Sequence, residues 1–309
     1  MEYREGVLIM KPTQRTKKTT WFLLATLLML AVFVSACGGG NASGGDSQGA
    51  GAVETPPVET PAEQPAGGDP LEAIKASGQL RVGTSADYPP YEFHALVDGK
   101  DEIIGFDIEI IKEVAKDLGV ELALTDMGFD GLLTALQSGN LDMVISGMTP
   151  TPERAEAVDF SDVYYVAIQK VIVRAEDKAT YTTIDSLAGK KVGAQLGAIQ
   201  EGIVTDQMPQ SELRALSKLP DLVLDLKSGN VEALVVEEPV AKAYIAANPE
   251  LALADIQLEQ DEAGSAIAMP KGSPALVEAV NATLKRLADE GKIDQFVTDA
   301  TNAMDKKAE

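Results

Sequence analysis

The chain repeats part of itself, and this internal repeat limits its possible folds more than any other feature. The segment LQSGNLDMVISG (136–147) returns as LKSGNVEALVVE (226–237), and RVGTS (81–85) returns as KVGAQ (191–195). Either pair alone could be a coincidence, since strands and SGN turns are common. Two pairs in the same order instead predict two lobes of similar plan, each with a first strand and a later helix–turn–strand unit.

Strand and helix patterns alternate from Leu71 onward. LRVGTS (80–85) has the apolar pattern of a buried strand, and the amphipathic stretch DIEIIKEVAKDLG (107–119) is typical of a helix that ends at a glycine. DGLLTALQSGN (130–140) predicts a second helix and LDMVISG (141–147) a second strand. This alternation predicts an α/β fold with mainly parallel sheets.

Four residues fall at the expected carboxyl ends of strands, where ligands bind in open α/β sheets. The repeat places Gly147 and Glu237 at one corresponding pair of strand ends, and Ser85 and Gln195 at another. If the two lobes face each other, these four residues line a shared cleft.

Arg154 lies just beyond one of these strand ends, in an unusual position for a cation. In SGMTPTPERAEAVDFS (146–161), Thr151 is suited to cap a helix, so Arg154 falls in its first turn. The unpaired N–H groups there carry partial positive charge, so a cation costs about 0.3–1 kcal/mol unless an anion lies nearby. We therefore expect Arg154 to bind an anion. The alternative is a surface arginine paired with Glu153 or Asp159.

The N-terminal segment has the composition of a secretory signal. Basic residues precede an apolar run of 14 residues, WFLLATLLMLAVFV (21–34), which is shorter than the run of about 20 that a membrane-spanning helix needs. Cys37, the only cysteine, follows and excludes an intrachain disulfide. VSAC (34–37) resembles a bacterial lipobox, which implies cleavage before Cys37 and lipid attached to it. A retained short anchor is the alternative, and Met1 or Met10 could be the true start.

The next segment and the overall charge limit the partners of the protein. Residues 38–70 contain no lysine or arginine and almost no large apolar side chain, which predicts a flexible tether. Without residues 1–36 the chain carries 21 basic and 46 acidic residues, a formal charge of −25. Such a body repels nucleic acid and anionic lipid. We therefore expect no nucleic-acid partner and contact with a membrane only through the lipid anchor.

Four segments carry a resemblance to a known family: LRVGTSADYPPYEF (80–93), IIGFDIEIIKEVAKDLGV (103–120), FDGLLTALQSGNLDMVISGMTPTPER (129–154) and VDFSDVYY (158–165). They are similar to the polar amino-acid-binding proteins of ABC importers, family 3 of the extracellular solute-binding proteins, over roughly residues 71–300. The resemblance implies the type 2 periplasmic-binding-protein fold, in which a two-strand hinge joins two similar lobes.

The family plan also predicts the domain boundaries. We expect a signal peptide over 1–36, a lipid-anchored linker over 37–70, a first lobe over 71–163 to which 266–309 return, a second lobe over 169–260, and hinge segments at 164–168 and 261–265. Two crossings allow the lobes to rotate while each core stays packed. The ligand would bridge the lobes and select the closed state.

The resemblance assigns the charged ends of an amino-acid ligand to particular residues. Arg154 matches the arginine that grips the α-carboxylate, for which a planar guanidinium can make two parallel hydrogen bonds. Gly147, Thr149 and Glu237 match positions that accept hydrogen bonds from the α-ammonium. The alternative for Glu237 is a solvated charge, with Glu238 beside it.

Aromatic and backbone groups would complete this ligand site. Tyr88 and Phe129 match the walls that cover the ligand's side chain, whereas Tyr91 and Phe93 are expected in the core. In the second lobe, GAQLGAIQEG (193–202) matches a loop and helix start that donate backbone N–H groups to the carboxylate.

Five positions define the backbone donors and the expected type of ligand. Ala198 and Ile199, with Gly197 before them, match the donating stretch. Ser85 occupies a position where several relatives for basic or amide side chains have Asp, and Gln195 adds another neutral group. We therefore expect a polar uncharged amino acid such as glutamine or cystine, although a cationic one stays possible.

The resemblance implies an extracytoplasmic lipoprotein, anchored to the cell membrane, that delivers a free amino acid to an ABC permease and its ATPase subunit. We expect a monomer without a cofactor or a bound metal. A same-fold enzyme, of the dehydratase or peptidoglycan lyase type, is one alternative. The single histidine, His94, is expected in a loop and leaves no Ser/His/Asp set. A ligand-sensing surface protein is the other alternative.

Overall fold

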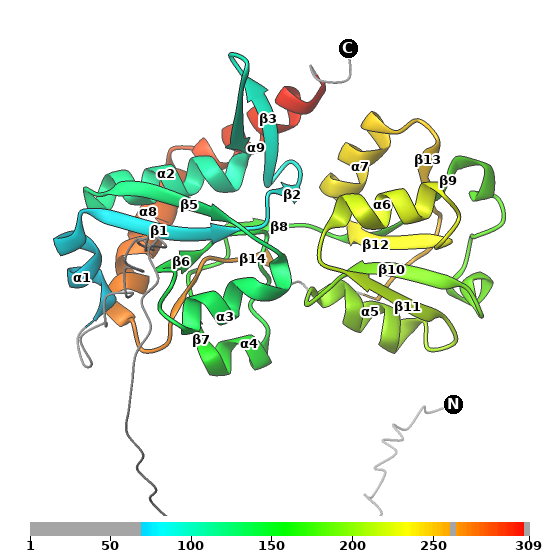
Figure 1. Cartoon of the computed structure of the whole chain (residues 1–309), viewed down its shortest axis with the longest axis horizontal. Coiled ribbons are helices and arrows are strands. Elements are labelled where there is room, and N and C mark those ends of the chain that lie inside the picture. The colour runs from blue at the N-terminus through cyan, green and yellow to red at the C-terminus, as the bar shows by residue number, and fades with distance from the viewer. Residues whose placement is uncertain (1–68, 260–263, 306–309) are drawn as a thin grey trace, which may run out of the picture. The chain divides into compact units, whose positions relative to one another are not determined.

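The computed structural model describes residues 69–259 and 264–305. These residues form two lobes, each built on its own five-stranded sheet (Figure 1). The expected signal peptide, Cys37 and nearly all of the expected tether lie outside the described residues, as do residues 261–263 of the second expected hinge segment.

The first lobe is built on β1 (Gln79–Thr84), β5 (Glu121–Asp126), β6 (Met143–Val144), β7 (Val158–Phe160) and β15 (Ala268–Pro270). The strand order is β5-β1-β6-β15-β7. Strand β1 pairs in parallel with β5 and β6, whereas β15 runs antiparallel to its neighbours. A small antiparallel sheet belongs to the same lobe and contains β2 (Asp87–Tyr88), β3 (Glu92–Val97) and β4 (Lys100–Ile104).

The helices of the first lobe are α1 (Pro70–Ser77), α2 (Phe106–Leu118), α3 (Leu132–Gln137), α4 (Pro152–Ala157), α8 (Pro274–Asp289) and α9 (Lys292–Asp305). Figure 1 shows α2 and α3 on opposite sides of the sheet. The amphipathic helix α2 begins one residue before the expected stretch. It is capped by Gly119, whose φ of 73° suits a residue without a side chain.

The second lobe is built on β9 (Gln169–Arg174), β10 (Lys191–Gln195), β11 (Glu212–Leu216), β12 (Ala233–Glu237) and β13 (Leu251–Leu253). Their order is β11-β10-β12-β9-β13, again with parallel strands on one side and antiparallel strands on the other. The helices of this lobe are α5 (Ile199–Gln207), α6 (Leu219–Lys227) and α7 (Glu238–Ala247). The described part of the chain has no helix long and apolar enough to cross a membrane.

The two sequence repeats occupy equivalent places in the two sheets. In the first lobe, Val82 pairs with Met143 and Gly83 with Val144. In the second lobe, the matching residues of β10 and β12 pair in the same register, Val192 with Ala233 and Gly193 with Leu234. The repeat in the sequence therefore corresponds to a repeat in strand pairing, and it aligns the strand ends of the two lobes.

The glycine in the middle of RVGTS and KVGAQ, Gly83 in the first lobe and Gly193 in the second, is needed for close packing. A Cβ atom at Gly83 would overlap Leu141 Cδ1, and one at Gly193 would overlap Leu234 Cδ2. In each lobe a leucine side chain thus fills the space above the first strand. Because these neighbours are fully buried or nearly so, they have little room to move.

Two short strands connect the lobes. Strand β8 (Tyr165–Val166) follows β7 and precedes β9, and β14 (Gly264–Ser265) follows β13 and precedes β15. They pair with each other in an antiparallel ladder. Both strands fall within the expected hinge segments, so the two passages of the chain between the lobes run side by side.

The helix and strand expected over 130–140 and 141–147 are shorter in the structure. The helix begins with a 3₁₀ turn, η1 (Phe129–Gly131), and α3 ends before the turn at Gly139, which has a φ of 72°. Only Met143–Val144 is regular strand, because the chain turns away at Gly147, where φ is 53°. Short 3₁₀ turns also occur in the second lobe, η2 (Ala175–Asp177) and η3 (Ile184–Leu187).

We expect Gly193→Ala to lower the free energy of unfolding by about 1–3 kcal/mol, because the added methyl group overpacks the second lobe against Leu234. Gly202→Ala in α5 is the matched control, since a Cβ there meets nothing within 4 Å. Alanine in that helix should raise stability by about 0.5–1 kcal/mol. Urea unfolding followed by circular dichroism measures both effects, and effects of the same sign would contradict the close approach at Gly193.

Candidate functional site

Strand ends and loops from both lobes meet around one small cavity. Its lining residues are Tyr88, Phe129, Ser146, Gly147, Thr149, Arg154, Gln195, Ala198, Ile199, Gln200 and Glu237. Every residue expected at the ligand site is among them except Ser85 and Gly197. The cavity holds about 10 Å³, near the lower limit for a single water molecule. A molecule as large as an amino acid can therefore enter only if the two lobes move apart.

Arg154 enters this cavity from the first turn of α4, where the Thr151 hydroxyl accepts its backbone N–H at 3.2 Å. The guanidinium donates to the carbonyl oxygen of Thr149 at 2.6 Å and to that of Gly197, in the second lobe, at 2.8 Å. Burial lowers the pKa of Arg154 to about 10, and no carboxylate contributes to this shift. The side chain therefore stays charged at neutral pH, with backbone carbonyls as its partners.

The simpler interpretation of Arg154, a surface ion pair, does not fit these contacts. Asp159 instead pairs with Lys271 at 3.1 Å and accepts hydrogen bonds from the backbone at Gly272 and Ser273. The guanidinium of Arg154 lies over the ring of Phe129, 5.5 Å from its centroid. The Phe129 ring thus makes a cation–π contact with the guanidinium, which stabilises the cation without neutralising its charge.

Glu237 faces the cavity from the end of β12 in the second lobe. It is buried, and its carboxylate accepts a hydrogen bond from the hydroxyl of Tyr91 in the first lobe. Desolvation raises the pKa of Glu237 to about 7, although hydrogen bonds from Tyr91 and Gln169 favour the charged form. A positive group placed beside this carboxylate would offset the desolvation cost.

Tyr91 has a polar role that the sequence did not suggest. Its ring is in the core, as expected, with Phe106 at 4.3 Å and Tyr165 at 5.6 Å between ring centroids. Its hydroxyl nevertheless reaches across to Glu237. Nothing in the local pattern indicates this contact, because the partner is 146 residues away in the chain.

Two glutamines of the second lobe were also not expected at the site. Gln200, in the first turn of α5, lines the cavity and donates to the side-chain oxygen of Gln169 at 2.8 Å. It also lies 3.4 Å from the hydroxyl of Tyr88, which accepts the backbone N–H of Glu237 at the same distance. Because both glutamines are buried, their position between the lobes depends on tertiary packing rather than on a local signal.

The expected backbone donors are partly engaged within the second lobe. The N–H of Gly197 donates to Glu201 Oε2 at 2.7 Å, and that of Ala198 donates to the Gln195 carbonyl at 3.1 Å. Ile199 is the first residue of α5, and N–H groups in a first helical turn have no acceptor within their own helix. The helix start can still donate to an anion, but with fewer groups than the resemblance implied.

Ser85 lies one layer behind the cavity lining. Its backbone N–H donates to the hydroxyl of Ser146 at 3.1 Å, and its own hydroxyl lies 3.4 Å from Asp87 Oδ1. Ser146, which was not expected at the site, therefore occupies the cavity surface in front of it. Ser85 has no carboxylate, but Asp87, two residues later in the chain, has one.

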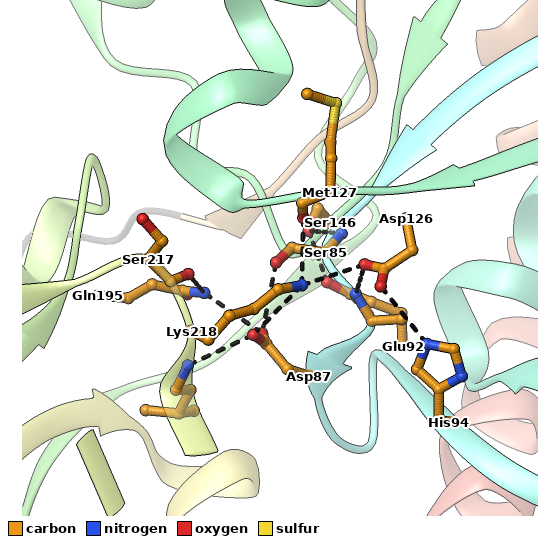
Figure 2. Close-up of polar contacts among 12 residues, drawn as sticks. Ser85, Asp87, Glu92, His94, Asp126, Met127, Ser146, Gln195, Ser217 and Lys218 are labelled. Atoms are coloured by element: carbon orange, nitrogen blue, oxygen red, sulfur yellow. Dashed lines mark hydrogen bonds and ion pairs between the residues drawn. The ribbon is translucent and has the colours of Figure 1, made fainter. Parts of the chain in front are cut away.

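Asp87 is the centre of a second set of contacts between the lobes (Figure 2). Its carboxylate is 3.7 Å from Lys218 Nζ and accepts a hydrogen bond from Gln195 at 3.3 Å, both in the second lobe. Lys218 also lies 3.2 Å from Asp126 Oδ1, so it stands between two carboxylates of the first lobe. Burial raises the pKa of Asp87 to about 6, against the opposing effect of Lys218.

A larger cavity of about 900 Å³ lies beside these contacts, but its chemistry is less specific. Alanine, proline and aromatic side chains form much of its lining, and neither Arg154 nor Glu237 reaches it. His94 lies at its edge; it belongs to β3 rather than to a loop and contacts Asp101 at 3.0 Å. Within the described ranges, no group of three or more acidic, histidine or cysteine side chains is placed to hold a metal ion.

Comparison with known proteins matches the chain to one family and to several of its relatives. The model of the bacterial extracellular solute-binding proteins, family 3, matches residues 80–300. The chain is 42% identical over 223 residues to the arginine-binding extracellular protein ArtP of Bacillus subtilis, covering 71% of this chain and 84% of ArtP.

Solved structures are similar over the same part of the chain. The amino acid ABC transporter substrate-binding protein AbpA from Streptococcus pneumoniae, bound to L-arginine, has 46% identity and a TM-score of 0.73, with 75% of this chain and 98% of AbpA covered. The ancestral amino-acid-binding protein AncCDT-1, a precursor of cyclohexadienyl dehydratase, has 34% identity and a TM-score of 0.68, with 75% and 99% covered.

We expect Tyr91→Phe to raise the pKa of Glu237 above its value of about 7, because the variant loses a donor that stabilises the carboxylate. One hydrogen bond to a charged group corresponds to a shift of about one unit. Carbon-13 NMR titration of labelled glutamate carboxyl groups measures the change. Tyr181→Phe, a buried tyrosine of the second lobe, is the control, and an equal shift in both variants would contradict the contact.

Proposed function

The chain belongs to the bacterial extracellular solute-binding proteins, family 3, and we propose that its small cavity captures a free amino acid for an ABC importer by closing two lobes on it. The fold is the α/β type 2 periplasmic-binding-protein fold, with two similar lobes, and each of its two five-stranded sheets is mixed rather than purely parallel. Members of this family work outside the cytoplasm, where they supply amino acids to the permease of an ABC transporter.

One observation carries the proposal: an arginine and a glutamate from opposite lobes reach the same cavity. Among the described residues, the guanidinium of Arg154 donates only to carbonyl groups and remains charged, so it offers two parallel donors to a carboxylate. Glu237 is buried with a pKa raised to about 7, so it gains most from a neighbouring cation. A free amino acid has a carboxylate and an ammonium two bonds apart, and it satisfies both groups at once.

Lobe closure follows from where these groups lie. The carboxylate would replace the Thr149 and Gly197 carbonyls at Arg154, and the ammonium would lie between Glu237 and the carbonyl of Gly147. Tyr88 and Phe129 would cover the side chain and exclude water, which strengthens the polar contacts. The paired strands β8 and β14 would act as the hinge, since they are the two passages between the lobes.

We propose L-arginine as the ligand. ArtP and AbpA are named for, or bound to, arginine. The neutral Ser85 favoured a polar uncharged ligand, but a carboxyl group, that of Asp87, lies 3.4 Å from its hydroxyl, behind the lining of the small cavity. Glutamine and cystine remain the alternatives.

We propose that the mature protein is a monomeric lipoprotein held at the cell membrane by lipid on Cys37. The support is the position of this cysteine after Val34-Ser35-Ala36 and the tether that follows it. Its further partners would then be the membrane-embedded permease and the ATPase subunit, with no cofactor of its own.

An enzyme of the same fold is the second candidate, because AncCDT-1 is a precursor of a dehydratase. The ArtP and AbpA similarities favour a transport role, since both are binding proteins. Long incubation with candidate substrates, followed by mass spectrometry, separates the two functions: a binding protein returns its ligand unchanged.

A thermal-shift screen should identify the ligand. Binding to the folded state raises the melting temperature by mass action, so L-arginine should give the largest increase among the twenty amino acids, ornithine and cystine. A larger increase with glutamine or cystine would reject a cationic ligand while leaving amino-acid binding intact. No increase with any of them would contradict the proposed function itself.

We expect Arg154→Ala to weaken L-arginine binding by about a hundredfold or more, because truncation of one partner in a buried charge pair costs about 2–5 kcal/mol. Arg154→Lys should recover only part of this loss, since an ammonium cannot donate in the same forked geometry. Isothermal titration calorimetry measures the affinities. Arg214→Ala is the matched control, because Arg214 pairs with Asp225 within the second lobe. Equal affinities for the Arg154→Ala and control variants would contradict the proposal that Arg154 binds the carboxylate of the ligand.

A further inference from the structure

Two carboxyl groups are buried directly behind the lining of the small cavity. Glu92 in β3 and Asp107 in the first turn of α2 are both 0% exposed. Desolvation is the main influence on the pKa of each, and in the described part of the chain the other main influences are carboxyl, hydroxyl and backbone groups rather than a cation. Buried ionised carboxylates are normally paired with a cation, so this pair needs another explanation.

The pair holds two neighbouring residues of the cavity lining. Asp107 Oδ2 accepts hydrogen bonds from the backbone N–H of Gly147 and from the hydroxyl of Tyr164, both at 2.9 Å. Glu92 Oε1 accepts a hydrogen bond from the hydroxyl of Ser146 at 2.6 Å, and Figure 2 shows this contact. The end of the strand that reaches the cavity is thus tied to both carboxyl groups.

The remaining oxygens of the pair indicate a proton. Glu92 Oε2 and Asp107 Oδ1 accept no hydrogen bond from any other described group. The two carboxyl groups nevertheless lie close enough that each changes the pKa of the other. An ionised carboxylate only accepts hydrogen bonds, so a bond between two carboxyl groups requires a proton on one of them. Two ionised groups would instead repel each other strongly in this buried place.

We propose that Glu92 and Asp107 share one proton at neutral pH and act as positioning residues for the amino-acid site. The inference rests on the proposed function, because its consequence is the placement of Ser146 and Gly147 beneath the ligand. The pair then carries one negative charge, which the Gly147 N–H and the Tyr164 hydroxyl stabilise. Tyr164 directly precedes β8, so the pair also joins the ligand site to one of the two connections between the lobes.

The surroundings of the pair favour retention of its proton. The titratable groups that interact with it electrostatically are Asp87, Tyr88, Tyr164 and Glu237. Asp87 and Glu237 are carboxyl groups whose negative charge disfavours a second charge on the pair, whereas the neutral Tyr164 hydroxyl donates to Asp107 and lowers its pKa. Burial, Asp107 and Asp87 keep the pKa of Glu92 well above its ordinary value of 4.5, and burial raises that of Asp107 to about 6 against hydrogen bonds from Gly147, Tyr164 and Glu92.

The direction of the pH dependence follows from these raised pKa values. The folded protein holds the proton more tightly than the unfolded chain, so the stability contributed by the pair is fully present below the ordinary carboxyl pKa. It is lost as the pH rises through the raised pKa of Glu92 in the folded protein. Wild-type stability should therefore fall toward alkaline pH.

Amide substitutions test the shared proton, because an amide N–H₂ can take over as the donor. Glu92→Gln and Asp107→Asn should each bind L-arginine within about threefold of wild type and lose the alkaline fall in melting temperature. The double variant places two donors opposite each other and should weaken binding by about tenfold or more. Glu113→Gln is the control, since Glu113 is on the same helix and pairs with Lys116 and Arg286 instead.

Infrared spectra of the ligand-free protein give a readout that does not depend on the ligand or on the double variant. At pH values above 7, Glu237 is mostly ionised, since its pKa is about 7. The wild type and Glu113→Gln should then show the carbonyl band of a protonated carboxyl group, and both single variants should lack it.

Two results would overturn the shared proton: no such band in the wild type, or a folded double variant that binds and melts like the single variants. A band that behaves as expected in a protein that binds no amino acid would support the proton pair while rejecting the proposed function.

Discussion

Arg154 keeps its charge in a half-buried place where, in the part of the chain that the structure describes, only backbone carbonyls accept the hydrogen bonds of its guanidinium. The carbonyls of Thr149 and Gly197 come from different lobes, so the guanidinium already bridges the cleft. Carbonyl dipoles stabilise a cation less than a carboxylate does, and burial accordingly lowers the pKa of Arg154 to about 10. The rest of the site can be understood as the arrangement that presents this charge to a carboxylate and excludes water around it.

The other charges of the cleft are mainly negative, and desolvation raises their pKa values. Glu237 reaches about 7, and Asp87 and Asp107 reach about 6. Separation of the lobes would return water to those at the interface, whereas closure buries them again. A ligand that carries positive charge on its ammonium and on its side chain offsets this cost. The same electrostatics thus connects ligand charge, lobe closure and the shared proton beneath the strand end.

Several sequence predictions succeeded because they rested on short-range or periodic signals. The repeat predicted equivalent strands, and the structure pairs Val82 with Met143 and Val192 with Ala233 in one common register. Thr151 caps α4 and places Arg154 in its first turn, as the local pattern indicated. The strand over 141–147 was predicted too long because the apolar pattern continues past the point where the backbone turns away from the sheet.

The sequence by itself determined the two-lobe α/β plan and placed Glu237 at a strand end and Arg154 in the first turn of a helix, because strand period, helix caps and the repeat are all encoded within short segments. Only the tertiary structure decided that Tyr91 donates to Glu237, that Ser85 lies behind Ser146, and that Glu92 and Asp107 are buried close enough to change each other's pKa. These contacts join distant segments through buried polar groups. Their geometry is set by how two lobes and a small sheet pack together, which no local pattern records.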